Sequence, residues 1–437
     1  MEQMNLVKEA RAGNITAHLQ EVSRKEGVNE EFLAEHVAEG KVVIPANILR
    51  NNIDPTGIGT GLSTKVNANI GTSPRKLDIA GEMEKANVAV KSGADTLMDL
   101  SSGGDIRRMR RELLSEIKVP LGTVPIYQAG LKALHERGAV VEMTGEDMFQ
   151  AIEEQVEEGI DFITVHCGVN MDIVSRINQN QRIIDIASRG GSFLWAWILK
   201  NEKENPLYAE FDRLLDIALA YDVTLSLGDG MRPGSIVDAT DGPQVQELVI
   251  LGELVKRARE AGVQVIVEGP GHVPLDQVAS NILLQKRICQ EVPFYILGPL
   301  VTDSAAGYDH ISAAIGGAVG ASAGADFLCY VTPAEHISLP DAEQVKEGVV
   351  ASKIAAHAGD IARGLPAALE RDRQMSLARK ELNWEEMRKC ALDPQAMENA
   401  MKKEGLGVGD ECSMCGEYCA VKIVNECHKG KISTGGN

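Results

Sequence analysis

The feature that most constrains the fold of this chain is a regular alternation of short β-rich runs and amphipathic helical runs between about residues 64 and 340. Helical runs such as EDMFQAIEEQVEEG (146–159) carry apolar residues at three- and four-residue spacing. A strand followed by a helix, repeated about every thirty to forty residues, is typical of a parallel sheet. The chain should therefore be an α/β protein.

Nine runs have strand character, one more than a closed eight-stranded barrel uses. They cover residues 65–71, 96–102, 122–128, 162–168, 183–191, 224–230, 265–272, 294–300 and 326–333. Eight strand–helix units close into a (β/α)₈ TIM-type barrel of about 250 residues. We expect such a barrel over residues 61–340, with one candidate outside it. The alternative is an open doubly wound sheet, which the absence of a Gly-rich dinucleotide fingerprint after the first strand disfavours.

The segments on either side of this region have different patterns. Residues 1–60 contain two helical stretches, about 4–12 and 29–39, followed by a Gly-, Pro- and Asn-rich loop. Residues 341–437 contain three helical stretches, then a group of cysteines and a polar tail (428–437) that we expect to be mobile. We therefore expect a small N-terminal region, a catalytic barrel and a helical C-terminal segment.

Charge and apolar content exclude several classes of protein. The formal net charge of −19 argues against a nucleic-acid partner, which needs a basic face. The first residues contain no apolar signal region, and no stretch reaches the roughly 18 apolar residues of a membrane span. We expect a cytoplasmic protein, in which eight cysteines do not form a disulfide framework.

Polar residues cluster at the predicted strand ends. At the carboxyl ends of barrel strands such residues point into one shared mouth, where active sites form. The ends carry Asn69, Met98, Asp99, Tyr127, His166, the SRGG run 188–191, the DGMR run 229–232, Glu268, His272, Tyr295 and His336. One polar strand end is usually a satisfied turn residue, but so many on one rim favour an active site.

Two groups at this rim suggest particular ligands. Gly-rich turns at SRGG and DGMRPGS let backbone N–H groups approach an anion, to which Arg189 or Arg232 would add a guanidinium. This suits a small phosphorylated substrate. His272 and His336 could share a divalent metal ion, although two histidines far apart in the chain are a weak signal for one.

Three cysteines, Cys412, Cys415 and Cys419, lie within eight residues near the C-terminal end. Thiolates are soft ligands for zinc or for iron–sulfur clusters. Three thiolates on a [4Fe–4S] cluster leave one iron open for S-adenosylmethionine, which electron transfer would cleave to a radical. Structural zinc prefers four ligands, which Cys427 or His428 would complete. The spacing of the cysteines alone does not distinguish an iron–sulfur cluster from a structural zinc site.

Ten sequence blocks together carry a family resemblance. In chain order they are NANIG, MDLSSGGD, GTVPIYQA, SRGG, LGDGMRPGS, EGPGHVP, PFYILGPL, GYDHI, CYVTPAEH and CSMCG. Over about residues 40–425 the chain resembles the phosphomethylpyrimidine synthase family of radical S-adenosylmethionine enzymes. The resemblance implies 5-aminoimidazole ribotide as substrate, an electron donor such as a flavodoxin or ferredoxin, and a homodimer in which the cluster-bearing segment reaches the partner's barrel.

The resemblance also assigns roles to individual positions. It implies a [4Fe–4S] cluster on Cys412, Cys415 and Cys419, and a zinc ion on His272 and His336. The implied substrate-contacting positions are Asn69, Met98, Tyr127, His166, Ser188, Arg189, Gly190, Asp229, Gly230, Met231, Arg232, Glu268 and Tyr295.

Two departures from the family pattern bear on the product. The chain reads TDSAAGYDHIS where pyrimidine synthases typically read TDIAPGYDHIT, so that Ser304 and Ala306 replace an Ile and a Pro. These changes add a hydroxyl and free one backbone dihedral in a loop expected to flank the mouth. The second gap between the clustered cysteines is also three residues, where many members have four.

A changed mouth loop on an unchanged core favours a paralogous branch, 5-hydroxybenzimidazole synthase. That branch uses the same substrate and cofactors to make the lower-ligand base of cobalamin under anaerobic conditions. We therefore expect a radical lyase that converts the ribotide to 5-hydroxybenzimidazole with release of formate. The alternative is phosphomethylpyrimidine synthase, which makes hydroxymethylpyrimidine phosphate for thiamin. Two alternatives come from other classes of protein. One is a barrel without catalytic activity that carries a structural zinc knuckle, and the other is a zinc hydrolase with Glu268 as general base.

Overall fold

A computed structural model describes residues 5–177 and 182–428. The chain divides into two compact units, residues 1–363 and 364–437. The part of the predicted mobile tail that follows His428 lies outside the described residues. Within those residues, no helix is both long enough and apolar enough to cross a membrane.

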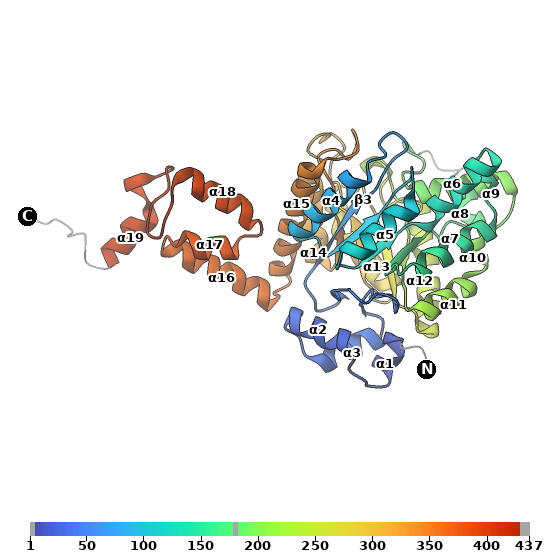
Figure 1. Ribbon diagram of the computed structural model, residues 1–437, viewed down its shortest axis with the longest axis horizontal. Coiled ribbons are helices and arrows are strands. Elements are labelled where there is room, and N and C mark those ends of the chain that lie inside the picture. The colour runs from blue at the N-terminus through green and yellow to red at the C-terminus, as the bar shows by residue number, and fades with distance from the viewer. Residues whose placement is uncertain (1–4, 178–181, 429–437) are drawn as a thin grey trace, which may run out of the picture. The chain divides into compact units, whose positions relative to one another are not determined.

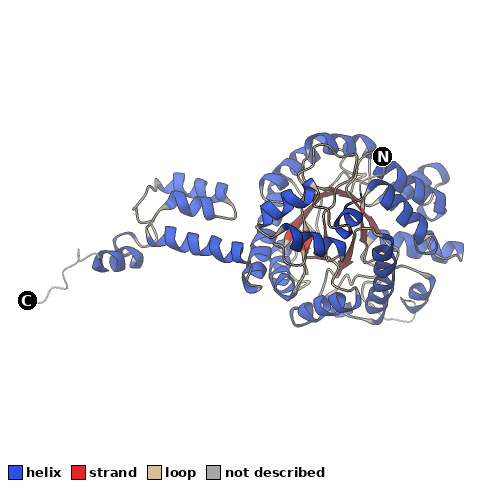
Figure 2. Ribbon diagram, turned by 90° about the horizontal axis from the view of Figure 1, so that it is seen from below, coloured by secondary structure: helices blue, strands red, loops and turns tan. Residues whose placement is uncertain are grey.

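The first unit is built around a closed barrel of eight parallel strands, which confirms the predicted (β/α)₈ fold and rules out the open sheet (Figures 1 and 2). The strands are nearly all buried, as expected when helices cover a parallel sheet and side chains fill its interior. In barrel order they are β10 (Phe327–Cys329), β3 (Lys65–Ile70), β4 (Thr96–Asp99), β5 (Leu121–Thr123), β6 (Phe162–Val165), β7 (Thr224–Leu227), β8 (Val265–Gly269) and β9 (Phe294–Leu297).

Helices surround this ring of strands, as Figure 2 shows. Those that follow the strands in sequence are α4 (Ile79–Lys91), α5 (Ile106–Glu116), α6 (Pro125–Arg137), α7 (Gly145–Glu157), α8 (Met171–Ile177), α9 (Arg189–Asn201), α10 (Pro206–Ala209), α11 (Phe211–Tyr221), α12 (Gly242–Ala261), α13 (Leu275–Ile288), α14 (Asp309–Ala323) and α15 (Ala342–Ala362). Local sequence sets their ends. At α7, for example, Thr144 and Asp147 cap each other's backbone N–H groups.

The ninth strand candidate, residues 183–191, is not a strand, and that prediction is wrong. The backbone N–H groups of Ile183 and Ile184 donate to the carboxylate of Asp238, each at 2.9 Å, so they pair with a side chain instead of a neighbouring strand. Ile183 is 70% exposed. Ser188 then caps the N-terminus of α9, whose first turn contains the SRGG run. The apolar residues of this segment have the composition of a strand, but the segment does not pair with another strand.

The N-terminal region has its own small core and lies against the barrel. It contains α1 (Leu6–Arg11), α2 (Ala17–Glu26), α3 (Glu30–Ala38) and the short antiparallel pair β1 (Val42–Val43) and β2 (Ile58–Gly59). The two predicted helices are present, and α2 between them was missed because Leu19 and Val22 are its only buried apolar residues. Residues Asp222, Gln264 and Asp161 hold the region at the amino ends of the strands, opposite the predicted mouth.

Helix α15 belongs to the first unit, so the division of the chain falls one helix later than the sequence pattern suggested. The helix packs on α14, α4 and β3. Its Asp360 carboxylate accepts hydrogen bonds from the Thr64 backbone N–H at 3.0 Å and hydroxyl at 2.7 Å, and pairs with Arg363 at 2.7 Å. These buried contacts join the end of the helix to the start of the first barrel strand.

Replacing Asp360 by asparagine should therefore lower the free energy of unfolding by about 2–4 kcal/mol, because Arg363 loses a buried charge partner. Chemical denaturation of the first unit measures this effect. Glu343→Gln, on an exposed position of the same helix, is the matched control and should change stability by less than about 0.5 kcal/mol. Equal stability of the two variants would contradict the role given to Asp360.

The second unit is helical, as expected. It contains α16 (Pro366–Lys380), α17 (Trp384–Cys390), α18 (Pro394–Glu404) and α19 (Ala420–His428). Over residues 364–428, the part of this unit that the structure describes, few side chains are buried, chiefly Ala368, Ala378 and Met387. This part of the unit therefore has little hydrophobic core of its own.

Candidate functional site

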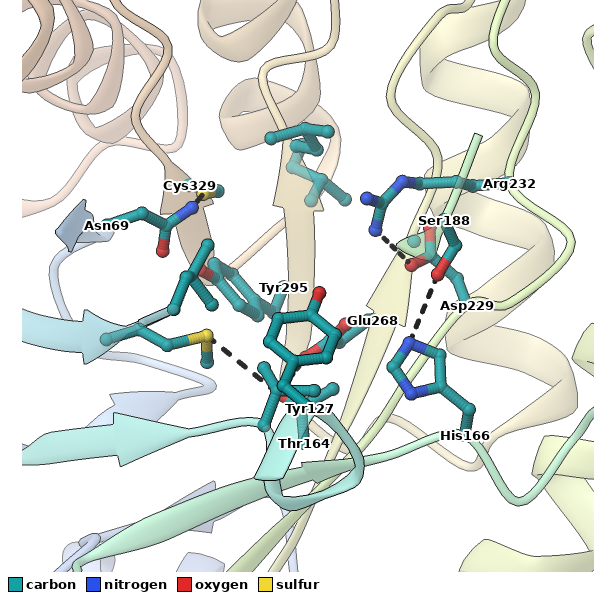
Figure 3. A pocket seen from close by; sticks show the side chains of 16 residues that line it. Asn69, Tyr127, Thr164, His166, Ser188, Asp229, Arg232, Glu268, Tyr295 and Cys329 are labelled. Atoms are coloured by element: carbon teal, nitrogen blue, oxygen red, sulfur yellow. Dashed lines mark hydrogen bonds and ion pairs between the residues drawn. The ribbon is translucent and has the colours of Figure 1, made fainter. Parts of the chain in front are cut away.

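A pocket with a cavity volume of about 80 Å³ opens at the carboxyl end of the barrel. Every barrel strand, or the segment that follows it, contributes at least one lining residue (Figure 3). This is the mouth at which the sequence placed the active site. Nine of the thirteen predicted substrate residues line it, namely Asn69, Met98, Tyr127, His166, Ser188, Asp229, Arg232, Glu268 and Tyr295.

The other four predicted residues lie beside the pocket. The Arg189 guanidinium stands over the Tyr127 ring, 5.0 Å from its centre, and Arg189 lines an adjoining pocket of about 220 Å³. Gly190 lies against the ring of His166, where a Cβ atom would come within 2.2 Å of Cε1, so only glycine fits. Gly230 and Met231 are buried in the turn between Asp229 and Arg232.

One wall combines a guanidinium with two carboxyl groups (Figure 3). Arg232 Nη1 lies 3.1 Å from Asp229 Oδ1. Glu268 Oε1 accepts hydrogen bonds from the hydroxyls of Thr164 and Ser226, each at 2.7 Å. Burial raises the pKa of Asp229 to about 7, against the opposing effect of Arg232, and burial also raises the pKa of Glu268. These carboxyls therefore hold protons closer to neutral pH than exposed ones do.

His166 is a neutral polar group in this site. Its Nε2 lies 3.1 Å from the Ser188 hydroxyl, which also accepts a hydrogen bond from the Gly191 backbone N–H. Burial, with the nearby Arg232 charge, lowers the pKa of His166 to about 3. Its Nδ1 is buried and has no hydrogen-bond partner among the described residues. A buried ring nitrogen without a partner is a place where a bound ligand can supply one.

A polar network inside the barrel supports the pocket. Two of its four members, Asn69 and Tyr295, were named as site residues from the sequence, but neither Asn67 nor Cys329 was. The Asn67 amide donates to the Tyr295 hydroxyl at 2.7 Å and to the Asn69 side-chain oxygen at 2.8 Å. The Asn69 amide in turn donates to the sulfur of Cys329 at 3.1 Å. Cys329 is buried and lines the pocket. Asn67 was detectable as a polar residue within a buried strand.

The two predicted metal ligands lie together in space. The ring centres of His272 and His336 are 5.2 Å apart. His272 Nδ1 lies 2.7 Å from an Asp303 carboxylate oxygen, and His336 Nδ1 lies 3.0 Å from an Asp309 carboxylate oxygen. A carboxylate on Nδ1 fixes the tautomer and leaves Nε2 as the free ligand atom, which is the usual arrangement of metal-binding histidines. The pair thus fits a metal ion, although its carboxylate partners were not predicted.

The three clustered cysteines lie on a turn in the second unit. Cys412 and Cys419 are half-buried, Cys415 is exposed, and all three are free thiols. Cys415 precedes a single 3₁₀ turn, Gly416–Tyr418, and Cys419 precedes α19. In the described parts of the chain, no three His, Cys, Asp or Glu side chains are gathered as a metal site. The fit to an iron–sulfur cluster therefore rests on donor chemistry, which is three accessible soft ligands on one short turn.

Comparison with known proteins agrees with these observations. The profile described as the Radical SAM ThiC family matches residues 5–426. Among solved structures, a dihydropteroate synthase from Coxiella burnetii matches with a TM-score of 0.40 and 13% identity, over 68% of this chain and 94% of that chain. A likeness this low carries no argument about function.

Curated relatives are far more similar and are named phosphomethylpyrimidine synthase. The protein from Thermoanaerobacter sp. (strain X514) is 58% identical over 423 residues, 97% of this chain and 98% of that protein. The Desulforamulus reducens protein is 58% identical over 95% of this chain and 96% of its own length, and the Moorella thermoacetica protein 56% identical over 98% and 99%. The chain therefore belongs to the Radical SAM ThiC family and is a radical S-adenosylmethionine enzyme of the lyase type.

Proposed function

We propose that this enzyme is a phosphomethylpyrimidine synthase, which rearranges 5-aminoimidazole ribotide to hydroxymethylpyrimidine phosphate with release of formate. The observation that carries the proposal is the gathering of nine sequence-predicted substrate residues around one barrel-mouth pocket. The relatives that align along nearly their whole length bear this name. Membership of a radical S-adenosylmethionine family argues against the barrel without catalytic activity and the zinc hydrolase.

The benzimidazole product expected from the sequence is not supported. That expectation depended on Ser304 and Ala306, which were placed in a loop flanking the mouth. Both are exposed, and neither lines the pocket. A serine hydroxyl in water carries no burial cost, and an exposed alanine leaves the pocket unchanged. The relatives point to the pyrimidine product instead.

We assign the anchoring of the ribotide phosphate to the side of the mouth formed by α9 and the 229–232 turn. Ser188 begins α9, so the first-turn N–H groups and the positive end of the helix dipole lie next to the pocket. Arg232 lines the pocket and Arg189 stands just beside it. Guanidinium groups suit a phosphate because they offer parallel donors.

Glu268 is the residue best placed to hold a proton against the substrate. Both hydroxyl donors, Thr164 and Ser226, reach the same oxygen, Oε1, so the proton of the neutral acid belongs on Oε2. Burial favours that neutral form. Glu268 also lines the pocket, which lets Oε2 give or take a proton there.

Cys412, Cys415 and Cys419 would hold the [4Fe–4S] cluster. When bound, that cluster supplies the electron that cleaves S-adenosylmethionine and so provides the radical for the rearrangement. The three thiols leave one iron free for the cofactor's amino and carboxylate groups. We further propose that the enzyme acts as a homodimer, each chain's cysteine segment serving its partner's barrel, with a flavodoxin or ferredoxin as electron donor.

His272 and His336 would hold a zinc ion through Nε2, with water or substrate completing its coordination. Asp303→Asn should then weaken zinc binding about 10- to 100-fold, because the amide no longer fixes the His272 tautomer. Competition with a chromophoric chelator measures the affinity. The matched control is Asp276→Asn, at an exposed position of α13. Unchanged affinity in the Asp303 variant, with loss of binding in His272→Ala, would remove Asp303 from this role.

Genetic complementation tests the proposed product. A bacterial strain that lacks its own phosphomethylpyrimidine synthase needs added thiamin, and this gene should restore growth without it. The same gene carrying Cys412→Ala should fail. If the intact gene, expressed as soluble protein under anaerobic conditions, does not restore growth, the pyrimidine assignment is wrong.

A further inference from the structure

One buried acidic residue outside the 229–232 turn forms a hydrogen bond with the backbone of that turn. Glu247 lies on α12 and is 2% exposed. Its Oε2 accepts a hydrogen bond from the Met231 backbone N–H at 2.7 Å. The Met231 carbonyl oxygen accepts a second bond from Arg182 at 2.9 Å. Side chains from outside the turn therefore fix both polar groups of the Met231 backbone.

The close packing around Glu247 indicates that its carboxyl group is held at the turn for a particular role. A Cβ atom on Gly230 would lie 3.1 Å from Glu247 Oε1 and 2.2 Å from a methyl group of Val169, so the turn can approach the carboxyl group only with glycine at this position. A buried carboxyl group without a compensating partner is costly. Among the described residues its Oε1 has no hydrogen-bond partner, and the charge of Arg182 lowers the pKa of Glu247 less than burial raises it. The hydrogen bond that Glu247 does accept comes from the turn itself.

A second, small cavity of about 20 Å³ lies between Glu247 and the functional residues. Its lining includes Asp229 and Arg232 from the turn, Glu247 from α12 and Glu268 from β8. Removing the Glu247 side chain would enlarge this cavity and leave the Met231 N–H unpaired. The turn would then have space to move and would have lost the hydrogen bond that holds it. Asp229 and Arg232 would shift with the turn.

We propose that Glu247 is a positioning residue, which holds the backbone at Met231 so that Asp229 and Arg232 face the substrate pocket. The inference rests on the proposed function only for the identity of the ligand. Burial raises the pKa of Glu247 to about 8, so at neutral pH the side chain is largely the uncharged acid. A glutamine resembles that form in shape and charge, and its amide oxygen can accept the same Met231 N–H. Glu247→Gln should therefore keep the turn in place, whereas Glu247→Ala should not.

The test compares Glu247→Ala, Glu247→Gln and Glu253→Gln, the last at an exposed position of the same helix. For aminoimidazole ribotide, the alanine variant should raise KM about 10- to 100-fold, since misplacing an anchor by about 1 Å costs this much. Its KM for S-adenosylmethionine should change less than about twofold. Glutamine should restore most of the ribotide KM, and Glu253→Gln should not differ from wild type. Glutamine as damaging as alanine, or an unchanged ribotide KM in a folded alanine variant, would overturn the proposal.

Amide hydrogen exchange on the same proteins provides a readout that needs no turnover. Peptides covering residues 229–234 should exchange faster in Glu247→Ala than in wild type, with no such change in the other two variants. If the alanine variant does not fold, Glu247→Asp, which withdraws the acceptor by one methylene group, should show the same local effect. Wild-type enzyme that makes no pyrimidine would refute the proposed function, while the exchange result would still decide the role of Glu247.

Discussion

Cys412→Ala is expected to abolish formation of 5′-deoxyadenosine, by at least about 1000-fold, while the barrel unit stays folded. In the proposed function three thiols would hold the cluster, so losing one would leave too few ligands to retain it. Cys412 also lies in the second unit and takes no part in the barrel core. The measurement is mass analysis of 5′-deoxyadenosine after anaerobic reconstitution, together with iron and sulfide content and the thermal unfolding of the barrel.

Cys427→Ala is the matched control for this substitution. Cys427 is exposed and stands outside the trio, so this variant should keep its iron and its activity. A zinc knuckle completed by Cys427 predicts the reverse, with tetrahedral zinc and dependence on all four thiols. Mixing Cys412→Ala chains with chains that lack a working pocket should restore activity if each segment serves its partner's barrel. Cleavage of S-adenosylmethionine by a pure Cys412→Ala protein would exclude the trio as the cluster ligands.

Arg232→Ala is expected to lower kcat/KM for the ribotide by about 100- to 1000-fold, equivalent to about 3–4 kcal/mol. The substitution removes a cation from the pocket and leaves Asp229 and Glu268 without their neutralising neighbour. Because Arg232 opposes the rise in pKa of both carboxyl groups, its loss should raise both pKa values further. The two groups would then remain protonated to higher pH, and the limb of the pH–rate profile that reports their titration should move to higher pH.

Arg257→Ala provides the matched arginine control. Its guanidinium pairs with Asp212 near the surface, where the Arg257 side chain is 41% exposed and the Asp212 side chain 83%. It should change kcat/KM less than about twofold, as expected for an exposed ion pair. Steady-state kinetics at several pH values measure both effects. Normal kinetics in Arg232→Ala would exclude this guanidinium as a substrate anchor.

The fold was predictable because nearly all of the local strand and helix signals in the sequence agree with the barrel. Strand-like runs recur with helical runs between them, and eight of the nine candidates became barrel strands. The ninth failed at Ile183 and Ile184, whose apolar side chains imitate a strand although their N–H groups bind Asp238. A linear pattern shows propensity but does not show which backbone groups find a neighbouring strand.

The residues of the candidate site that stand at the carboxyl ends of strands could be predicted from the sequence. Residues such as Asn69 and Glu268 face the mouth because they stand at the carboxyl ends of parallel strands. Supporting groups such as Asp303 and Glu247 were not predicted, because they reach their partners through contacts across the chain that no spacing encodes. The choice of product was misjudged because loop position alone cannot show that Ser304 points to solvent.

The most direct measurement is the mass of the product that the anaerobically reconstituted enzyme makes from aminoimidazole ribotide, S-adenosylmethionine and a reductant. We predict a hydroxymethylpyrimidine that retains its phosphate, formed together with formate and 5′-deoxyadenosine. A benzimidazole without phosphate, or no consumption of the ribotide by protein that contains its full complement of iron, would contradict the proposed function.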